Sequence, residues 1–584
     1  MTSTTPGTTP HRPRISSSIG PEPKRALTLA TLFMAGFCLL GAYLAWQLVA
    51  SDVVAAATIG HGTLWTSYLF VAQDGMVAAA FAVLLLACWP LARSRALDRL
   101  AALTTARYTL PAIILIGFVA SFIARVVAHH SFNLSLDEFL PEFQAEIFRS
   151  GRLLMPLSAD AFEAHRVFQP FFTYADSTHQ LWMSHYRPVH AALIAAFDSI
   201  ATADLLNPVM AVVALWAIAD IARRVFPTLP EAPVLAAALL LATPQFVITN
   251  GSGFAFASHL AFNMLWLALF VRGGMRHHIG AAVIGFFAVG LHQVHVHPLF
   301  VAPFLAALLL GAYGPRIAVL PYILSYGLAL PTWMMWPEIA VFLQTGDVAA
   351  LPGSIFEIEY VSNYLNYAKN AAQTETGRVP MMTLVNILRF SLWLCPAVLV
   401  LMGVALAFRR GMGRTPALCA VSFLLTVFAC YILMPNQMHT WGARYYHPVL
   451  GAAIIFALAG YAAIKDSGSG PILLRYVTVL SAVSLLVFLP LRGMQVAEKV
   501  GPRAAVQARL AAIDADVVVI PTRGLYAGYD FVRNAPDLSN RPLLVFDFEL
   551  DRRAILQGLD IKYLTRPELF GLGLPLGTFL EPGS

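Results

Sequence analysis

The stretch YTLPAIILIGFVASFIARVVAHHSFNLSLDEF, residues 108–139, decides how this chain is organised. Its first part, up to Ala128, is apolar and long enough to cross a bilayer as a helix of about 20 residues. Two adjacent acids, Asp137 and Glu138, follow nine residues after this run ends. Acidic side chains next to a membrane segment are costly and point to a function. The side of the membrane that this pair faces therefore matters for any reading of the chain.

The composition indicates a membrane protein with many spans. Of its 584 residues, 58% are hydrophobic and 12% are charged, and the mean hydropathy is +0.68. Soluble domains are more polar than this. The basic residues behind the net charge of +6 lie mostly in short segments between apolar runs, so they indicate topology and no nucleic-acid partner. The five cysteines lie within apolar runs without metal-ligand spacing, which indicates packing residues: Cys38, Cys88, Cys395, Cys419 and Cys430.

Thirteen apolar stretches predict an all-α polytopic membrane protein with about 13 transmembrane helices. They are 27–50, 67–92, 108–128, 205–222, 232–249, 254–271, 278–296, 298–313, 317–336, 384–408, 415–434, 446–464 and 476–493. The first is too long for a signal-peptide core and lacks a cleavage site of small residues, so we expect it to remain as a membrane helix. Residues 1–26 are rich in Pro, Ser and Thr and predict a disordered cytoplasmic tail.

The positive charges assign a side to every segment. They recur at every second junction between the apolar stretches: Arg93, Arg95, Arg99, Arg223, Arg224, Arg272, Arg276, Arg316, Arg409, Arg410, Arg414, Lys465 and Arg475. Basic residues collect on the cytoplasmic side of membrane proteins. A single orientation of the chain in the membrane places all of these junctions on that side. It predicts a cytoplasmic N-terminus and places loops 129–204 and 337–383, and the tail after residue 493, outside the cytoplasm.

This topology divides the chain into four parts. The tail 1–26 is followed by two additional N-terminal helices in 27–107, a membrane module in 108–493 and a small domain in 494–584. In the first loop, Phe139, Phe143 and Ile147 recur at helical spacing, which predicts a helix lying in the membrane interface. In the last part, 515–521 and 541–548 predict buried strands and 549–559 predicts a helix, together a small α/β domain.

Four polar clusters fall on the predicted outer side. Asp137 and Glu138 could supply a general base, with the neighbouring acid tuning its pKa or holding a metal; alternatively they cap a helix. The turn GLHQVHVHPLF contains His292, Gln293, His295 and His297. These side chains could ligate zinc or donate hydrogen bonds to a phosphate, and Glu138, His292 and His295 are the candidate metal ligands.

The other two clusters carry arginines. The turn NQMHTWGARYYHP, 436–448, contains Trp441, Arg444 and Tyr445; Arg444 could clamp a phosphate, and the aromatic residues could stack on a sugar or form an interfacial belt. The segment HYRPVH, 185–190, adds Arg187 and His190. We assign no role to Asp74, Asp198 and Asp220.

These blocks, taken in order, resemble a known family. The Asp-Glu pair followed by FQAEIFRSGRL, with the later turn WGARYYHP, resembles the bacterial family-39-like branch of the GT-C membrane glycosyltransferases. That branch includes protein O-mannosyltransferases and the aminoarabinose transferase that acts on lipid A. The resemblance covers roughly 108–465. The chain departs from it by two extra spans before the first loop, and by the turn TNGSGFAFASH, which lacks the further acid that many relatives carry.

The resemblance implies a hexosyl- or pentosyltransferase in the bacterial inner membrane that works on the extracytoplasmic face. Its donor would be a polyprenyl-phosphate-linked sugar, and its acceptor a lipid, a glycan or a protein. Asp137 would be the base with Glu138 as its partner, and the carrier phosphate would be held by polar residues at later turns, here the histidine turn and Arg444. No cofactor is required by this scheme, although a divalent metal ion is a candidate.

Two other functions compete with this interpretation. A transporter or flippase of lipid-linked saccharides would also need many helices, but it predicts polar residues near the middle of the bilayer on broken helices. A polymerase or ligase of lipid-linked saccharides also uses arginines and histidines on the outer face. The acid pair followed by an amphipathic helix is less expected in that class.

Overall fold

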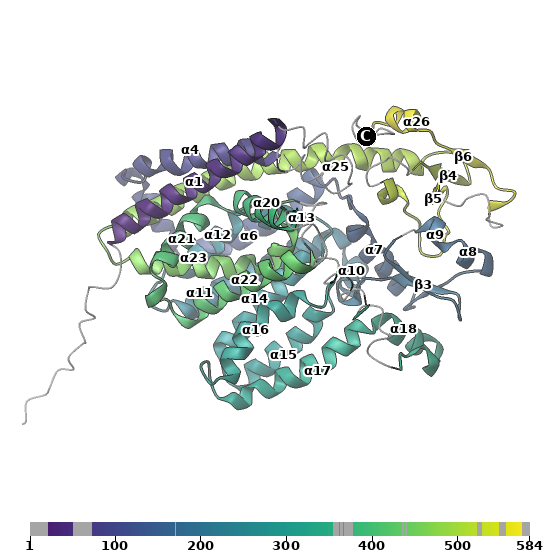
Figure 1. The fold of residues 1–584 in the computed structure, drawn as a ribbon, viewed down its shortest axis with the longest axis horizontal. Helices are drawn as coiled ribbons and strands as arrows, with labels where there is room; N and C mark the ends of the chain where they lie inside the picture. Colours follow the sequence, from purple (N-terminus) through teal and green to yellow (C-terminus); the bar gives the residue numbers. More distant parts are fainter. Residues whose placement is uncertain are drawn as a thin grey trace, which may run out of the picture.

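The structure is a computed structural model that describes residues 22–50, 70, 73–169, 171–353, 361–362, 366, 369, 378–434, 437, 441–521, 528–547 and 556–574. Most of these residues form a helical bundle, and a smaller part with strands lies at one end of it (Figure 1). Within these described residues, seven helices are long and apolar enough to cross a membrane, or up to nine if two bent helix pairs each count as one span. The predicted count of thirteen is not confirmed, because four of the predicted stretches form helices of only 14–17 residues.

The principal helices of the bundle follow the apolar stretches. They are α1 (Pro23–Ala50), α4 (Gly75–Leu91), α6 (Thr109–Ile123), α11 (Leu206–Val225), α12 (Ala232–Leu241), α13 (Pro244–Gly251), α14 (Phe256–Arg272), α15 (Met275–Val289), α16 (Val296–Leu309), α17 (Leu320–Met334), α20 (Arg378–Trp393), α21 (Pro396–Ala407), α22 (Arg414–Leu433), α23 (Leu450–Ile464), α24 (Gly470–Val483) and α25 (Leu489–Ala511). The α12–α13 pair bends by 62° and the α20–α21 pair by 115°. Both second helices start at a proline, Pro244 and Pro396, which cannot continue the hydrogen-bond ladder of the helix before it.

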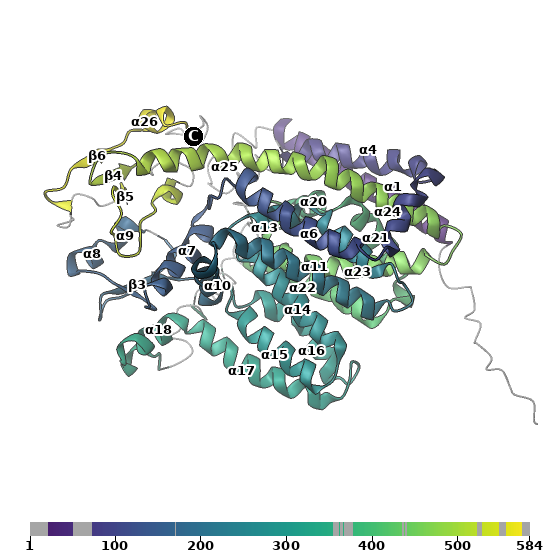
Figure 2. The ribbon, with the colours of Figure 1, turned by 180° about the vertical axis from the view of Figure 1, so that it is seen from behind.

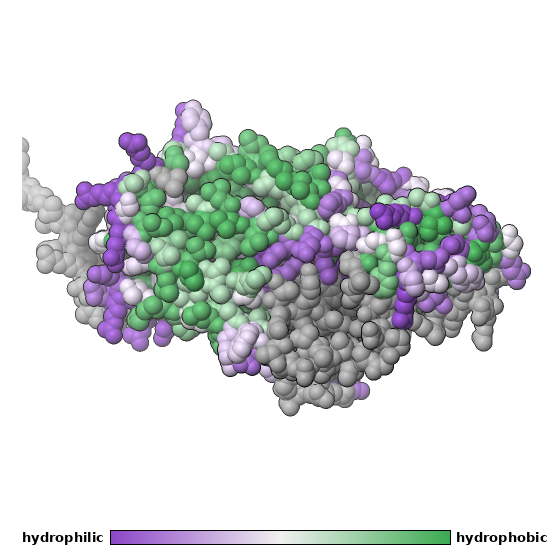
Figure 3. All heavy atoms as spheres, turned by 90° about the horizontal axis from the view of Figure 1, so that it is seen from above, coloured by the Kyte–Doolittle hydropathy of each residue, from purple (hydrophilic) through white to green (hydrophobic). Residues whose placement is uncertain are grey.

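The surface of the bundle is suited to lipid. Figure 3 shows that apolar residues cover much of the visible face of the bundle, with hydrophilic residues gathered at both ends of this apolar area. On α17, Leu320, Ile323, Leu324 and Leu328 are between 47% and 69% exposed. Apolar side chains this exposed on a peripheral helix favour contact with a bilayer over contact with water.

Asp74 ties the additional N-terminal helices to the rest of the bundle, which the sequence did not indicate. Its carboxylate accepts hydrogen bonds from Arg389 Nε and Trp393 Nε1, both at 3.0 Å, and pairs with Arg492 Nη1 at 2.7 Å. The guanidinium of Arg492 also lies 4.3 Å from the Trp393 ring centroid. These four side chains are buried. Asp74, just before α4, thus joins α20 and α25 through one buried carboxylate, a structural contact that sequence analysis did not predict.

The first large loop and the tail pack together at one end of the bundle. The loop contains α7 (Leu136–Arg149), β1 (Met155–Pro156), α8 (Ala159–Glu163), α9 (His165–Phe168), β2 (Thr173–Asp176), β3 (Leu181–Ser184) and α10 (Pro188–Ile200). Its strands form an antiparallel sheet in the order β1-β3-β2. The tail contributes a parallel sheet in the order β5-β4-β6, made of β4 (Val517–Ile520), β5 (Leu543–Phe546) and β6 (Ile561–Tyr563), and the short helix α26 (Arg566–Gly571).

The helix α7 lies between these two sheets instead of in a membrane interface. Its buried residues Leu140, Phe143 and Ile147 share one hydrophobic cluster with Val519 of β4 and Val545 of β5. The apolar face that predicted lipid contact is therefore covered by the tail. The tail strands match the predicted stretches 515–521 and 541–548, whereas most of the helix predicted at 549–559 falls outside the described residues.

A long helical run connects the bundle with the tail. The segment Gly470–Ala511 comprises α24, a π-helical turn at Ser484–Phe488 and α25. Figures 1 and 2 show α25 running from beside α1 and α4 to the strand β4. The start of the tail is thereby fixed to the bundle, next to the N-terminal end of α7.

Candidate active site

Asp137 lies where the loop, the tail and the bundle meet. It is in the first turn of α7, which begins after the N-cap residue Ser135. Arg444 donates a hydrogen bond from Nη1 to Asp137 Oδ2 at 2.6 Å, and the Tyr186 hydroxyl donates to Asp137 Oδ1. Asp137 and Arg444 are 307 residues apart in the chain, so only the fold brings them together.

Arg444 is held by aromatic side chains as well as by Asp137. It begins the short 3-10 helix Arg444–Val449 (η11), and its guanidinium lies 4.8 Å from the Tyr445 ring centroid and 5.7 Å from that of Phe254. Gln293 Nε2 donates to the Tyr445 hydroxyl at 3.3 Å. A cation over aromatic faces is stabilised without being neutralised. The residue can therefore offer its charge to an anionic ligand that competes with Asp137.

Glu138 points away from Asp137 and completes the start of α7. Its Oε2 accepts a hydrogen bond from the Ser135 N–H at 3.3 Å, and its Oε1 accepts one from the Gly253 N–H at 3.0 Å. This is the arrangement of a capping box. Glu138 therefore caps the helix, as the alternative interpretation of the acid pair predicted, whereas the Asp137 carboxylate contacts Arg444. A Cβ on Gly253 would collide with Asn133, so the close approach of this loop to α7 requires glycine.

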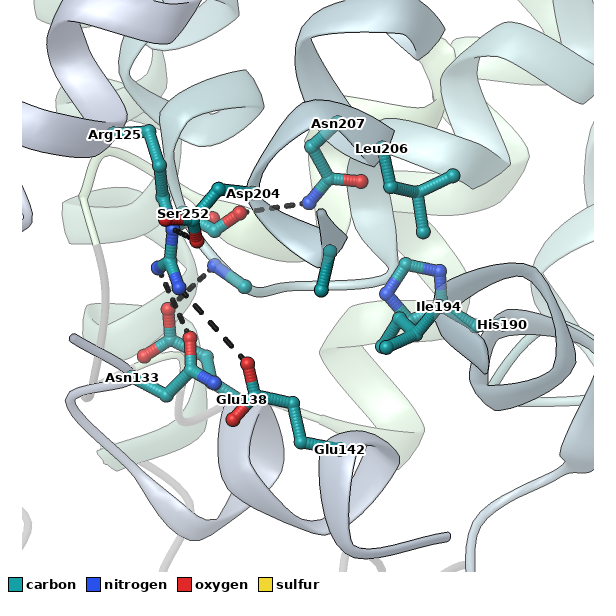
Figure 4. A pocket seen from close by; sticks show the side chains of 12 residues that line it. Arg125, Asn133, Glu138, Glu142, His190, Ile194, Asp204, Leu206, Asn207 and Ser252 are labelled. Carbon is teal, nitrogen blue, oxygen red and sulfur yellow. Dashed lines mark hydrogen bonds and ion pairs between the residues drawn. The ribbon is translucent and has the colours of Figure 1, made fainter. Parts of the chain in front are cut away.

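A cavity of about 20 Å³, enough for about one water molecule, lies beside Glu138. Figure 4 shows Arg125 pointing into it between Asp204 and the acids of α7. Arg125 Nε donates to Asp204 Oδ1 at 2.6 Å, and its Nη1 donates to Asn133 Oδ1 at 3.1 Å. A longer contact of 4.0 Å joins Arg125 Nη2 to Glu142 Oε1. The Arg125 guanidinium thus contacts the carboxylates of both Asp204 and Glu142 at this cavity.

The tail also contributes to the start of α7. Asp530 Oδ1 accepts a hydrogen bond from the Leu136 N–H at 2.9 Å, although the two residues are 394 positions apart. Burial raises the pKa of Asp530 to about 7, and the nearby Arg533 guanidinium opposes this shift. Arg533 in turn lies 4.3 Å from the Phe132 ring centroid and 5.4 Å from that of Phe139. The residues around Asp137 are therefore held in place from two sides.

Some predicted histidines lie at the site and others do not. The ring of His292 is 4.3 Å from that of Tyr186, and burial lowers the pKa of His292 to about 3, so it is neutral at physiological pH. His190 Nδ1 is 3.1 Å from Ser258 Oγ. His297 is used elsewhere: its Nδ1 lies 2.7 Å from Asn263 Oδ1 and its Nε2 lies 2.9 Å from the Tyr326 hydroxyl.

The remaining predicted residues have structural contacts. Arg187 is the N-cap residue of α10, and its Nη1 donates to the His185 carbonyl at 3.0 Å. His295 precedes α16, and burial lowers its pKa to about 4. Trp441 is buried and packs edge-on against His129 at 6.3 Å. Of the residues predicted for the site, the structure brings Asp137, Arg444, Tyr445, Gln293 and His292 together.

The candidate metal ligands do not fit a metal ion. Among the described residues, no group of three or more His, Cys, Asp or Glu side chains is arranged to hold one. Glu138 uses its two oxygens for the backbone of Ser135 and Gly253. The three candidates Glu138, His292 and His295 therefore form no metal site here, and we assign no step to a metal.

Three residues at or near the site escaped sequence reasoning. Tyr186 stands directly beside Arg187 in a segment that was singled out, but a phenol gives no signal of its own there. Arg125 lies inside the apolar stretch 108–128, and a charge in such a place is a usable signal of function. Asp530 is in the tail, and no pattern in the sequence relates it to Leu136.

Ionisation of Glu138 is expected to make the protein less stable as the pH rises from about 4.5 to 7. Burial raises the pKa of Glu138 from 4.5 to about 7. Within this window the folded protein retains a proton that the unfolded chain has released, so the stabilisation is complete below pH 4.5 and is lost as the pH rises through 7. Thermal unfolding across this range, compared between the wild type and Glu138→Gln, measures the effect.

The variant Glu138→Gln cannot ionise, so its unfolding temperature should depend less on pH in this window. The exposed Glu163, changed to Gln, is the matched control and should leave the profile unchanged. A profile of Glu138→Gln that runs parallel to that of the wild type would contradict the assignment.

Comparisons with known proteins give structural neighbours only. No protein-family model matches the chain, and no curated protein matches its sequence. The structure of ArnT from Cupriavidus metallidurans bound to undecaprenyl phosphate is similar over 75% of this chain and 86% of that chain, with 12% identity and a TM-score of 0.44. AglB from Archaeoglobus fulgidus, in complex with an inhibitory peptide and a dolichol-phosphate, is similar over 75% of this chain and 65% of that chain, with 14% identity and a TM-score of 0.38.

The oligosaccharyltransferase from Archaeoglobus fulgidus in complex with zinc and sulfate is similar to the same degree, over 74% of this chain and 62% of that chain, with 14% identity and a TM-score of 0.38. ArnT and AglB are both GT-C glycosyltransferases, the superfamily that the sequence resembles. At TM-scores below 0.5 this likeness carries no argument about function, which is therefore argued from the site itself.

Proposed function

We propose that this protein transfers a sugar from a polyprenyl-phosphate-linked donor to an acceptor on the extracytoplasmic face of a bacterial inner membrane. The observation that carries this proposal is the direct contact of Asp137 with Arg444 at 2.6 Å, at the end of a bundle whose surface suits lipid. Such a transfer needs a base for the acceptor hydroxyl and a cation for the leaving phosphate. Asp137 and Arg444 supply one of each.

In this mechanism, donor binding frees the base. Arg444 holds Asp137 in the absence of substrate, and the phosphodiester of the donor, a second anion with two free oxygens, competes for the guanidinium; the negative charge of the phosphate rises as it leaves. Tyr445, whose ring lies beside Arg444, keeps the cation at the phosphate side of the site. Asp137, still oriented by the Tyr186 hydroxyl, is then available for the acceptor.

The bond changes balance without a further reactant. The Asp137 carboxylate takes the proton of the acceptor hydroxyl while the acceptor oxygen bonds to the anomeric carbon. The bond between that carbon and the phosphate oxygen breaks, and its electron pair leaves on the polyprenyl phosphate. Arg444 stabilises the charge of this leaving group, and Tyr186 donates to the carboxyl that accepts the proton.

The direct test is transfer from a radiolabelled polyprenyl-phosphate sugar to membrane glycolipids and glycans by the purified protein in nanodiscs. The proposal is supported if the wild type transfers the label to the acceptor and Asp137→Asn does not. Movement of the donor across proteoliposomes without any acceptor, together with no transfer, would support the flippase instead. Comparing the glycolipids and glycans of a deletion strain with those of its parent identifies the acceptor to use.

Changing Arg444 to Lys is expected to raise the KM for the donor about tenfold, because lysine keeps the charge but loses the paired N–H groups that bind phosphate. Steady-state transfer at varied donor concentration measures this. The control is Arg541→Lys, at an exposed arginine of the tail, which should behave as the wild type. An unchanged KM in Arg444→Lys would exclude Arg444 as the phosphate ligand.

A further inference from the structure

A row of aromatic side chains leads from the tail to Asp137. Phe172 stacks on Tyr186 with ring centroids 5.7 Å apart and an angle of 24° between the planes. Tyr186 is the residue whose hydroxyl donates to Asp137. Phe171 lies next in the row, 6.3 Å from Phe172. The row thus begins at the candidate base and continues outward.

The two phenylalanines of this row are unusually exposed. Phe171 is 44% exposed and Phe172 is 48% exposed, although most large apolar side chains of the loop 129–204 are buried or partly buried. Adjacent exposed rings of this size commonly mark a binding surface. They lie just before β2, in the part of the molecule that contains α9 and β3 and stands away from the bundle (Figure 1).

The backbone at Phe172 is strained in order to hold its ring there. Its φ is +58°, in the left-handed region that a bulky residue rarely adopts. The carbonyl of Phe172 accepts a hydrogen bond from the His185 N–H at 2.8 Å, which continues the ladder between β2 and β3 and keeps the strained conformation. Glycine would fit this position without strain. Strain of this kind collects at functional sites.

The tail supplies the outer end of the row. Tyr529, in the short 3-10 helix Gly528–Phe531 (η13), packs edge-on against Phe171 at 5.1 Å. Phe546, at the end of β5, packs on Phe171 at 6.4 Å. Tyr529 directly precedes Asp530, which holds the start of α7. The same short segment of the tail therefore contacts both the aromatic row and the helix of the candidate base.

We propose that this aromatic row, made of Phe171, Phe172, Tyr186 and Tyr529, binds sugar rings of a carbohydrate acceptor, an inference that rests on the proposed function. Sugar rings present C–H groups of partial positive charge, which are attracted to the negative faces of aromatic rings. The row is continuous with the base, so a sugar that stacks on Phe172 presents the next residue of the acceptor to Asp137. The tail then has a defined role, which is to complete the acceptor site.

The surroundings of the row favour a carbohydrate over a lipid chain. The row lies between the loop and tail sheets and not among the lipid-facing residues of helices such as α17, so a lipid chain is not the expected occupant. The strands β2 and β5 beside the row are edge strands with which a peptide backbone could pair, so the test below includes a peptide.

The test is saturation-transfer NMR on the full chain in nanodiscs, with linear hexasaccharides of glucose, mannose, galactose and arabinose as separate probes and no donor present. At least one should bind the wild type, and Phe171→Ala combined with Phe172→Ala should weaken that binding about tenfold or more. Tyr563→Ala is the control, because Tyr563 is equally an exposed aromatic residue but lies on β6, at the opposite edge of the tail sheet from β5. It should bind as the wild type does.

A second variant separates recognition from folding. Phe172→Gly relieves the strained backbone, so its unfolding temperature should equal or exceed that of the wild type, while its affinity for the hexasaccharide should still fall. Equal binding by the double variant and the wild type would overturn the proposal. The absence of binding by all four probes at concentrations up to about 10 mM would also overturn it. So would tighter binding to the row by a Ser/Thr hexapeptide, or by vesicles of phospholipid alone, than by any of the hexasaccharides.

These outcomes are distinct from failure of the proposed function. Asp137→Asn should bind the hexasaccharide normally while transfer is lost. If transfer persists in Asp137→Asn, the proposed mechanism fails whatever the row binds. If transfer requires Asp137 but the hexasaccharide binds equally well without the rings of Phe171 and Phe172, only the proposed acceptor site is disproved.

Discussion

Changing Asp137 to Asn is expected to lower the rate of sugar transfer by about 10²–10⁴, the usual cost of removing a general base. Asn keeps the shape of the side chain and its contact with Tyr186, but it cannot take the acceptor proton. Arg444 loses its ion pair in this variant, so the affinity for the donor phosphate should stay equal or rise. Single-turnover transfer at saturating donor, with donor binding measured in parallel, separates the two effects.

Asp198→Asn is the matched control. Asp198 lies in the same loop and also pairs with an arginine, Arg149, but Arg149 is at the other end of α7, about 18 Å from Asp137 along the helix axis. This variant should transfer sugar at nearly the rate of the wild type. Normal transfer by Asp137→Asn at wild-type expression would remove Asp137 from the mechanism.

The largest effect on stability is expected at Asp74. Asp74→Asn would remove the negative charge that Arg389 and Arg492 both contact, and breaking a buried ion pair in this way costs about 3–5 kcal/mol. The additional N-terminal helices should then loosen from α20 and α25. The unfolding temperature in detergent and the yield of folded protein in membranes measure the loss.

Asp98→Asn serves as the comparison. Asp98 pairs with Arg475 at 2.7 Å, but its side chain is 54% exposed, and an exposed pair contributes only about 0–1 kcal/mol. The two variants therefore remove the same kind of group from opposite environments. Similar unfolding temperatures for Asp74→Asn and Asp98→Asn would show that the buried cluster does not hold the bundle together.

The sequence was sufficient for the local features of the site. Asp137 could be singled out because an acid beside an apolar run is rare, and Arg444 because an arginine in a short turn departs from the sidedness of the other charges. Both features can be read from a few neighbouring residues. Their mutual contact could only be proposed, because the turn 436–448 and the first loop are separated by eight further apolar stretches.

Features that depend on packing between distant segments were beyond the sequence. The amphipathic pattern of α7 shows that one face is apolar, but lipid and protein satisfy such a face equally well, so its burial under β4 and β5 was missed. Hydropathy likewise gave the positions of the helices but not their lengths. The helices α14, α15 and α16 end close to Gly273, Gly290 and Gly311, and a hydropathy average over about 20 residues does not resolve such breaks.

The bond between Leu136 and Asp530 has a consequence for the timing of biosynthesis. A ribosome delivers the chain from its first residue, so the segment with Asp137 emerges nearly 400 residues before its anchor does. The start of α7 therefore lacks its hydrogen bond to Asp530 until the last part of the chain has been translated and translocated. A premature stop codon before Asp530 would thus leave the helices of the bundle in the product and the start of α7 without this hydrogen bond.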